Sequence, residues 1–485
     1  MKTPLVRTAA VAALALMSAA SLQAQTVASA AIPPASPSVS DSIPNKTVLS
    51  SADKAKADSA AAMAKAAAKA KEKAMMLPPI EVQHYRPVDQ RGINVFEPPK
   101  DDTTEFTGYK LQFGGSFTQQ FQALQHSNSA KPNVVAGVNQ NQLITIGNGF
   151  NNATANLYTD VQMARGIRVA LTTYLSARHH QEAWVKDGYL LVDASPIDVD
   201  ALNTIMKYLT LKVGHFEIDY GDQHYRRSDN GNAMYNPLVG NFIMDAFTTE
   251  IGAEAYVRSH GFLAMAGMTG GEVHGQVTAP SKRSPSILGK LGFDQQLSPN
   301  LRVRLTGSLY QKAKSASNTL YTGDRAGSRY YDVLENTAST EDANAWSGNL
   351  RSGLNLSSKV RAIVVNPFIK YGGLEFFGNI EQAKGRAATE TADRTFRQNV
   401  GELTYRFLDD HLYVTGRYNT VTGRLAGTTS DIRIDRSQVG GGWFVTPGIL
   451  AKVEYVNQQY KDFPLTDIRH GGQFKGFMVE GVVGF

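Results

Sequence analysis

The pattern of hydrophobic and polar positions has period two from about residue 109 onward. The stretch YKLQFGGSFTQQF, which starts at Tyr109, places aromatic and aliphatic side chains on one face and Lys, Gln, Ser and Thr on the other. The last residues, GGQFKGFMVEGVVGF, alternate in the same way and end on Phe485. A repeat of two is that of a β-strand with one apolar and one polar face. The pattern therefore predicts strands from Tyr109 to Phe485.

The connections between these segments alternate between short and long. Short turns such as TPG at 446–448 contrast with long polar connections, at 122–149, 217–246, 312–344, 382–395, 421–431 and 461–471. Short turns at one end and long loops at the other are typical of an up-and-down barrel in an outer membrane. We therefore expect an all-β fold, an antiparallel transmembrane β-barrel over residues 109–485. It also follows that Phe485 lies on the lipid-facing side of the closing strand.

Counting the alternating segments predicts sixteen strands, an even number with both ends on the short-turn side. The expected strands are 109–121, 150–163, 167–178, 186–193, 205–216, 247–257, 261–270, 286–293, 301–311, 345–356, 372–382, 396–407, 411–420, 432–445, 449–460 and 473–485. The stretch 358–371 could form two more strands, so eighteen is the alternative. A barrel of this width leaves an aqueous channel, which makes a pore the expected function.

The residues before the barrel divide into four zones. Residues 1–24 have a basic start, an apolar run and small residues near Ala24, the form of a secretory signal peptide. Residues 25–50 are rich in Ser, Pro and Ala and read as a disordered linker. The Ala- and Lys-rich segment 51–76 predicts a periplasmic helix or thin coiled coil, with a spacer of partial helicity as the alternative. Residues 77–108 are punctuated by Pro and are expected to form an extended strap that packs on something larger.

Composition narrows the function further. The chain has no cysteine, so no disulfide stabilises it. Residues 1–75 hold nine Lys and Arg against four Asp and Glu, which leaves 76–485 with about +1 of the total charge of +6. The basic balance thus belongs to the N-terminal end, and we expect no nucleic-acid partner. Acidic cell-wall polymer is a candidate contact for 51–76.

Three stretches carry a resemblance to a known family. The run YLTLKVGHFEIDYGDQHYRRSDNGNAMYNPLVGNFIMDAF resembles the fifth strand and following loop of the phosphate-selective porin O and P family. NPFIKYGGLEFFGNIEQAKG and RQNVGELTYRFLDDHLYVTGRYN are similar to its later strands. The resemblance implies sixteen strands, a homotrimer and a third external loop folded into the pore. Phosphate-selective members use a lysine cluster at the constriction, whereas 217–246 contains no lysine here.

The long loop and the inward strand positions supply the candidate site residues. We expect loop 219–241 to enter the channel, with the constriction formed by Tyr220, Arg226, Arg227 and Asp229. An external cap over the trimer axis is the alternative for this loop. Alternation places nine basic and nine acidic residues on the lumen face, and the candidate pore-lining residues among them are Arg168, Lys212, Glu250, Glu254, Arg302, Arg304, Arg406 and Arg417. Arg302 with Arg304 is the best anion-attracting position, unless these charges pair on the wall.

The combined reading is an outer-membrane porin of a Gram-negative-type bacterium for passive diffusion of small hydrophilic solutes, with an anion or phosphate preference as the finer expectation. The expected partners are membrane lipids, lipopolysaccharide and the barrel-assembly machinery, for which Phe485 is the candidate signal. We expect no enzyme activity, metal or cofactor, because the histidines lack metal-ligand spacing and no nucleotide motif is present. The alternatives are a structural tether through 51–76, and a barrel enzyme built on His215 and Ser228.

Overall fold

The computed structural model describes residues 63, 79–97, 100, 104–151, 153–176, 183–271, 277–321, 329–338, 348, 350 and 354–485. The expected signal peptide 1–24 and linker 25–50 lie outside the described residues. The expected helical segment 51–76 does too, apart from Met63. Within the described ranges, no helix combines the length and the apolar character needed to cross a membrane.

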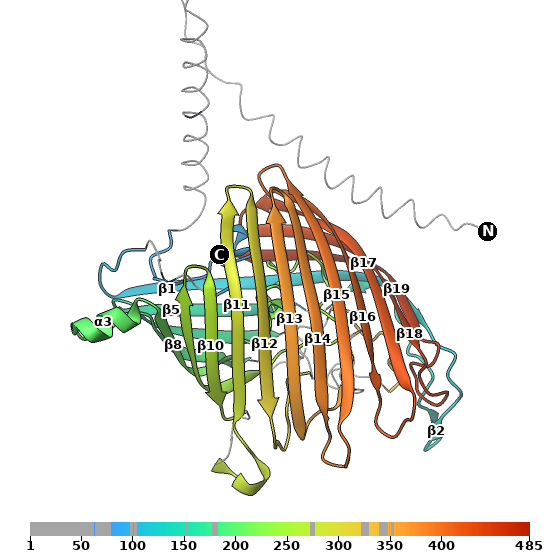
Figure 1. The fold of residues 1–485 in the computed structure, drawn as a ribbon. Helices are drawn as coiled ribbons and strands as arrows, with labels where there is room; N and C mark the ends of the chain where they lie inside the picture. Colours follow the sequence, from blue (N-terminus) through green and yellow to red (C-terminus); the bar gives the residue numbers. More distant parts are fainter. Residues whose placement is uncertain are drawn as a thin grey trace, which may run out of the picture. The chain divides into compact units, whose positions relative to one another are not determined.

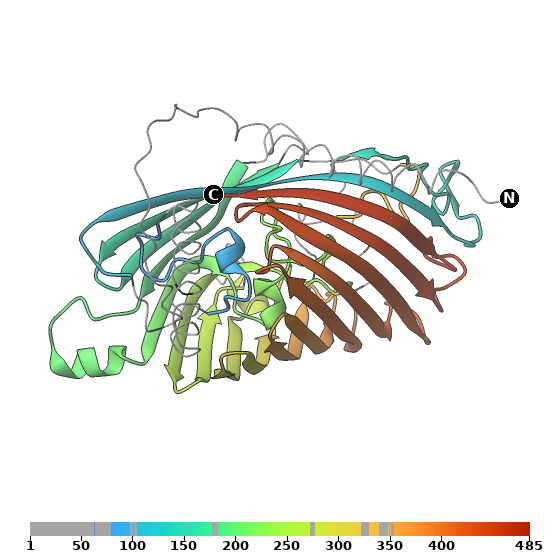
Figure 2. The same ribbon diagram turned by 90° about the horizontal axis from the view of Figure 1, so that it is seen from above.

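A single antiparallel sheet closes on itself (Figures 1 and 2). The ring of 17 strands includes the two-residue β4 (Gly149–Phe150), and the other sixteen form the wall. The wall strands are β1 (Lys110–Ser127), β5 (Thr154–Ala164), β6 (Ile167–Ser176), β7 (Ala183–Val192), β8 (Leu209–Glu217), β9 (Thr249–Ser259), β10 (Phe262–Thr269), β11 (Ser286–Ser298), β12 (Leu301–Lys312), β13 (Lys359–Tyr371), β14 (Leu374–Arg386), β15 (Arg394–Phe407), β16 (Leu412–Arg424), β17 (Asp431–Thr446), β18 (Ile449–Lys461) and β19 (Gln473–Gly484). The predicted count of sixteen is confirmed.

Closure is made by β1 and β19, whose pairing runs from Ser116 opposite Gly484 to Ser127 opposite Gln473. Phe485 extends this ladder, because its backbone N–H and C=O both bond to Gly115, with N···O distances of 3.1 and 3.0 Å. A Cβ atom at Gly115 would lie 2.8 Å from the Phe485 ring, so only glycine leaves room for that ring. The C-terminal residue is therefore part of the barrel seam, and its role as an assembly signal stays a prediction.

Strand β18 illustrates why these sequences form a membrane barrel. Val453 and Tyr455 are exposed on its outer face, whereas Lys452 and Glu454 are buried on its inner face. A closed barrel pairs the backbone groups of every wall strand, and its apolar outer face is stable in hydrocarbon. The chain is an outer-membrane β-barrel.

The two ends of the barrel differ as expected. Short turns join β5 to β6, β9 to β10, β11 to β12, β13 to β14, β15 to β16 and β17 to β18, at the end where β1 begins. The connection from β7 to β8 lies at the same end and contains the exposed helix α3 (Asp200–Met206). Long loops connect the strands at the other end, and the first holds the hairpin of β2 (Val134–Val135) and β3 (Val138–Asn139). By this asymmetry, the short-turn end faces the periplasm.

Two predicted strands need correction. None of the described residues of the expected strand 345–356 is extended in the sheet, and Leu354 is helical. The strand that occupies this place in the wall is β13, which lies in the stretch 358–371. The sequence pattern indicated this stretch only as a possible source of two additional strands. The strand expected at 205–216 begins only at Leu209, because α3 occupies the preceding residues. In both places the apolar residues do not belong to a wall strand with one face toward lipid.

Candidate functional site in the barrel lumen

The connection between β8 and β9 crosses the barrel interior. At one side Asn230 donates hydrogen bonds to the carbonyl oxygens of Ala155 on β5 and Leu175 on β6. At the opposite side, the backbone N–H groups of Val239, Ile243 and Met244 donate to side chains of β18, β16 and β15, namely Glu454, Asn419 and Gln398. Contacts to strands all round the ring require the connection to lie inside it. We call residues 218–248 the lumen loop; it includes the short helix η2 (Asp222–Tyr225).

The four predicted constriction residues all lie on the lumen loop and bond to partners inside the barrel. Tyr220 donates to Glu381 of β14 at 3.1 Å. Arg226 donates to Glu402 of β15 at 2.7 Å, and Arg227 binds Asp245 through two hydrogen bonds of 2.8 and 2.6 Å. Asp229 forms an ion pair with Lys186 of β7. The external-cap alternative is therefore excluded for this loop, while its role as the constriction stays a prediction.

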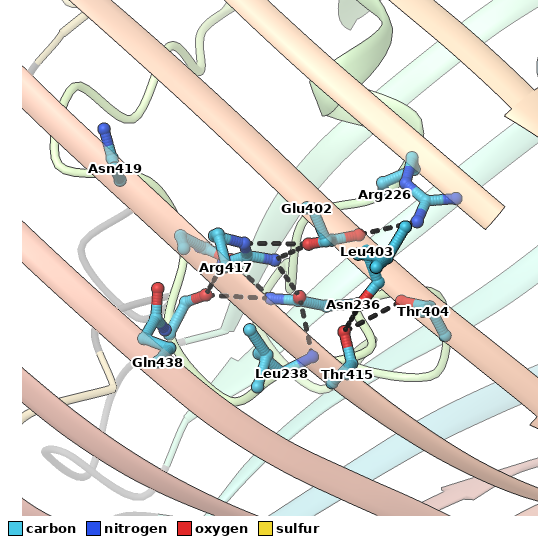
Figure 3. A network of polar contacts seen from close by, with 12 residues as sticks. Arg226, Asn236, Leu238, Glu402, Leu403, Thr404, Thr415, Arg417, Asn419 and Gln438 are labelled. Carbon is cyan, nitrogen blue, oxygen red and sulfur yellow. Dashed lines mark hydrogen bonds and ion pairs between the residues drawn. The ribbon is translucent and has the colours of Figure 1, made fainter.

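Figure 3 shows how the loop is held at β15 and β16. Glu402 accepts hydrogen bonds from Arg226 of the loop and from Arg417 of β16, the latter at 2.8 and 2.5 Å. Arg417 also donates to the Asn236 side chain at 2.9 Å and to the Gly240 carbonyl at 2.6 Å. Each guanidinium thus joins the wall to the loop, and all these groups are buried. The network fixes the loop to one side of the wall.

The segment before β1 also enters the barrel, at its periplasmic mouth. We call residues 79–97 the strap; it contains the short helix η1 (Gln90–Gly92). Its backbone contacts the turn between β17 and β18, where the Gln90 N–H donates to Pro447 O at 2.9 Å. Arg86 donates to the Tyr225 carbonyl of the lumen loop at 2.8 Å and lies 3.6 Å above the Tyr235 ring. The surface on which this segment packs is therefore the inside of the barrel.

Strap, loop and wall meet in one buried ion cluster. The Lys290 ammonium of β11 contacts carboxylates of Glu97, Asp219 and Asp222 at 2.8, 2.6 and 2.9 Å. Arg304 of β12 binds Asp222 at 2.7 and 2.8 Å and Glu97 at 2.9 Å. The cluster therefore links the strap, the lumen loop and two neighbouring strands through three carboxylates and two cations.

The electrostatics of this cluster favour its charged state. Burial alone would raise the pKa of the Glu97 carboxyl, but the adjacent Lys290 and Arg304 hold that pKa well below its usual range. The pKa of Asp222 is lowered by the same two cations against the same effect of burial. The imidazole of His224 also loses solvation, yet its hydrogen bonds to Asp219 and Glu217 raise its pKa. The charged forms of Glu97 on the strap and Asp222 on the lumen loop are thus stabilised by Lys290 and Arg304 on the wall.

All eight predicted pore-lining residues face the lumen, and most are bonded to other groups. Six are buried, namely Arg168, Glu250, Glu254, Arg304, Arg406 and Arg417. Their contacts are with neighbouring wall strands, the strap or the lumen loop, as in Arg406 with Glu375 at 2.9 Å and Glu250 with Tyr310 at 2.6 Å. Lys212 and Arg302 are less buried and contact Glu254 and Asp294 at 3.6 and 2.7 Å. These contacts agree with the alternative given in the sequence analysis, that the charged residues of the lumen face pair with each other.

An apolar layer fills the other part of the lumen, toward the long-loop end. Inward side chains of β13, including Val360, Ala362 and Val364, are almost completely buried. They belong to one cluster with Ile243 of the lumen loop and Leu320 of the connection between β12 and β13. That connection was expected to be a polar external loop over 312–344, but its described part also folds inward. The connection between β12 and β13 folds inward because its apolar residues would be exposed to water in an external loop.

The described part of the interior contains hollows, of which two border the strap. One, of about 250 Å³, lies against β5 to β9 and is lined by charged and tyrosine side chains, including Tyr85, Arg168, Lys212 and Glu217. The other, of about 590 Å³, opens at the periplasmic end between the strap and the turns near Asn300 and Gly372. Both hollows are lined in part by strap residues, such as Tyr85 in the first and Asn94 in the second.

The candidate hydrolase residues His215 and Ser228 do not contact each other in hydrogen-bonding geometry. His215 Nε2 lies 3.0 Å from Thr249 Oγ1, whereas Ser228 Oγ accepts from Asn236 at 3.2 Å. The two candidate catalytic residues therefore have different partners. Across the described ranges, no group of three or more His, Cys, Asp or Glu side chains has a geometry that could hold a metal ion.

Lys290 is the main lumen residue that sequence reasoning missed. It lies on β11, with Ile287 and Leu291 exposed on the opposite face. The alternation ILGKL, read with Ile287 outward, already places Lys290 inward. The signal was therefore present in the sequence. Its three carboxylate partners come from distant segments and could not be found that way.

Comparison with known proteins shows similarity to solved outer-membrane barrels at low sequence identity. No family model matches the chain, and no curated protein matches it. Solved structures similar to it include an anion-selective porin from Comamonas acidovorans (10% identity, TM-score 0.46, covering 78% of this chain and 100% of that one). They also include OprB of Pseudomonas putida (10%, 0.46, 78% and 94%) and the outer membrane channel DcaP of Acinetobacter baumannii (9%, 0.45, 79% and 99%). The fold assignment rests on the strand pairing described above, since these identities and scores are low.

Proposed function

We propose that the protein is an outer-membrane porin that passes small hydrophilic solutes by diffusion through a narrowed lumen. The observation that carries this proposal is the hollow of about 250 Å³ along β5 to β9, whose lining includes many charged and tyrosine side chains. A sixteen-stranded barrel is too wide for its own wall side chains to fill. The strap and the lumen loop occupy most of the remaining space, so we expect a low conductance.

The proposal includes no strong preference for anions. The four arginines on which that expectation rested are bound to carboxylates: Arg226 to Glu402, Arg227 to Asp245, Arg302 to Asp294, and Arg304 to Asp222 and Glu97. The hollow is lined by cations such as Arg168 and by anions such as Glu217. Mixed charge of this kind supports weak ion selectivity over phosphate specificity.

Filling the hollow tests the proposed route. Ala170 lines the hollow from β6, and the adjacent Val169 has the opposite strand orientation. We expect Ala170→Trp to lower single-channel conductance several-fold because the indole occupies the space through which solutes move. Val169→Trp is the matched control, since its indole faces away from the lumen. Equal conductance of the two variants would contradict this route.

We also propose a homotrimer, supported by the uneven length of the wall strands. Over the residues that the structure describes, β6 to β10 have 10, 10, 9, 11 and 8 residues, whereas β11 to β19 have 12 to 16. Shorter strands span less of the hydrocarbon layer, so that sector is better covered by protein than by lipid. Mass measurement of the detergent-solubilised protein tests this, and a monomeric mass would refute it.

A further inference from the structure

A group of basic residues lies on the outer wall, where no solute in the lumen can reach it. Arg361 of β13, Lys384 of β14 and Arg397 of β15 are exposed on the outward face of the barrel. They lie near the long-loop end, close to the turn that joins β14 to β15 at the lower end of the barrel in Figure 1. By the orientation argued above, this is the extracellular end.

The register brings these cations together. Arg361 is directly opposite Lys384 in the pairing of β13 with β14. In the pairing of β14 with β15, Thr395 is opposite Lys384, so Arg397 is the diagonal neighbour of Lys384. Directly opposite side chains have Cβ atoms about 5 Å apart and diagonal ones about 7 Å, and facing like charges destabilise a sheet. This arrangement is unfavourable unless an anion lies among the three.

No protein group supplies that anion within the described residues. Arg361, Lys384 and Arg397 form no hydrogen bond or ion pair with any of them, and the other direct neighbours of Arg361 and Arg397 are Gln311, Gln382 and Thr422. The nearby Asp393 carboxylate is already bound by Lys359 at 2.8 Å and by Arg386 at 2.7 Å. The patch therefore has five cations and one carboxylate.

The residues next to the patch identify the source of the anion. On β13 the outward face continues toward the membrane centre with the exposed apolar residues Ile363 and Val365. On β14 and β15 it passes first through Gln382 and Asn399 and then reaches the exposed apolar residues Ile380 and Leu403. The cations thus lie at the level of lipid headgroups, beyond the apolar band that faces the acyl chains. Arginine binds phosphate oxygens through paired N–H groups, and basic residues at this level attract anionic headgroups.

We propose that Arg361, Lys384 and Arg397 form a binding site for the phosphate groups of lipopolysaccharide in the outer leaflet. The acyl chains of the bound molecule lie along Ile363, Ile380 and Leu403. The site rests on the outer-membrane position of the barrel and is independent of whether the lumen conducts.

Lipid A binding to the purified full chain in detergent tests the site. We expect the triple variant R361Q/K384Q/R397Q to bind diphosphoryl lipid A at least tenfold more weakly than the unmodified chain. The matched control is R424Q/R433Q/K461Q, which removes the same charge from the same end of the barrel. Those three cations are already paired with Asp431 or Asp435, so we expect a change of less than threefold. Equal losses in both variants, or no loss in the first, would overturn the proposal.

Two further measurements are needed. The first distinguishes lipid A from free phosphate as the bound group, and the second tests the site in a way that does not depend on the folding of the triple variant. Dephosphorylated lipid A and millimolar inorganic phosphate should not compete for the site; competition by free phosphate would refute the lipid assignment. In lipid-free detergent, Lys384→Gln should raise the temperature of heat modification because it removes the facing charge. With lipid A present the same variant should be less stable than the unmodified chain. Absence of this reversal would contradict a bound phosphate at this position.

Discussion

Replacing Glu97 by Gln tests whether the strap is held in the mouth by the buried ion cluster. Glu97 is the strap's carboxylate in that cluster, and its side chain is only 4% exposed. The substitution keeps the shape and one acceptor oxygen, but it removes the charge that contacts Lys290 and Arg304. Asp219 and Asp222 remain to balance those two cations, so no unpaired charge is created.

The expected magnitude follows from the charged hydrogen bonds that the substitution removes from Lys290 and Arg304. A hydrogen bond to a charged group contributes about 1.5–3 kcal/mol, so we expect strap docking to weaken by about 2 kcal/mol. Since about 1.4 kcal/mol corresponds to tenfold, the undocked population should rise about 30-fold. Barrel folding should be unaffected because the wall strands keep their pairing.

Limited proteolysis measures this population, because the Arg91–Gly92 bond of the strap is a trypsin site. When opening and closing are fast, cleavage follows the population of the open form. We expect cleavage after Arg91 to be about 30-fold faster in Glu97→Gln. Glu81→Gln is the matched control on the same segment: its contact with Lys110 is 3.7 Å long and exposed, so it contributes at most about 1 kcal/mol. Equal cleavage rates in both variants and the unmodified chain would refute the reasoning.

Three further predictions follow from the same structure. Lys290→Met leaves Glu97 and Asp222 with Arg304 and leaves Asp219 with His224. The loss of this buried cation should destabilise the docked strap by about 3–5 kcal/mol, more than Glu97→Gln does, in the same trypsin assay. Because the pKa values of Glu97 and Asp222 are lowered in the folded protein, their contribution to stability is present above about pH 4 and is lost as pH falls through the folded-state pKa values. Single-channel conductance recorded at decreasing pH should then show longer openings. An unchanged record would contradict this. Val453→Arg places a charge in the middle of the outer face of β18 and should destabilise the barrel by about 2–4 kcal/mol in vesicle-folding titrations, whereas Val453→Leu should not.

The wall of the barrel could be predicted from the sequence because each wall strand carries its own period-two pattern. Alternation alone places Arg406 and Arg417 inward, and both are buried in the lumen. The pattern failed at 345–356, where the apolar residues Leu350, Leu354 and Leu356 pack in the lumen cluster. Burial inside the barrel and burial in lipid both select apolar side chains, so composition could not distinguish them.

The interior was less predictable than the wall. The entry of the lumen loop was expected from its length, and Tyr220, Arg226, Arg227 and Asp229 lie on that loop. Their partners were not foreseeable, because Glu381, Glu402 and Asp245 come from three separate segments. Strand alternation gives the side of the wall on which a residue lies. It gives no information on which loop crosses to meet that residue.

The most direct test of the account is single-channel conductance of the full chain beside a variant in which residues 222–245 are replaced by a short Gly/Ser linker. Heat modification on gels first establishes that both barrels are folded. The account predicts small discrete openings for the full chain and a several-fold larger conductance for the variant, because the lumen loop narrows an otherwise wide channel. Folded barrels that give no discrete conductance in either form would contradict the assignment as a porin.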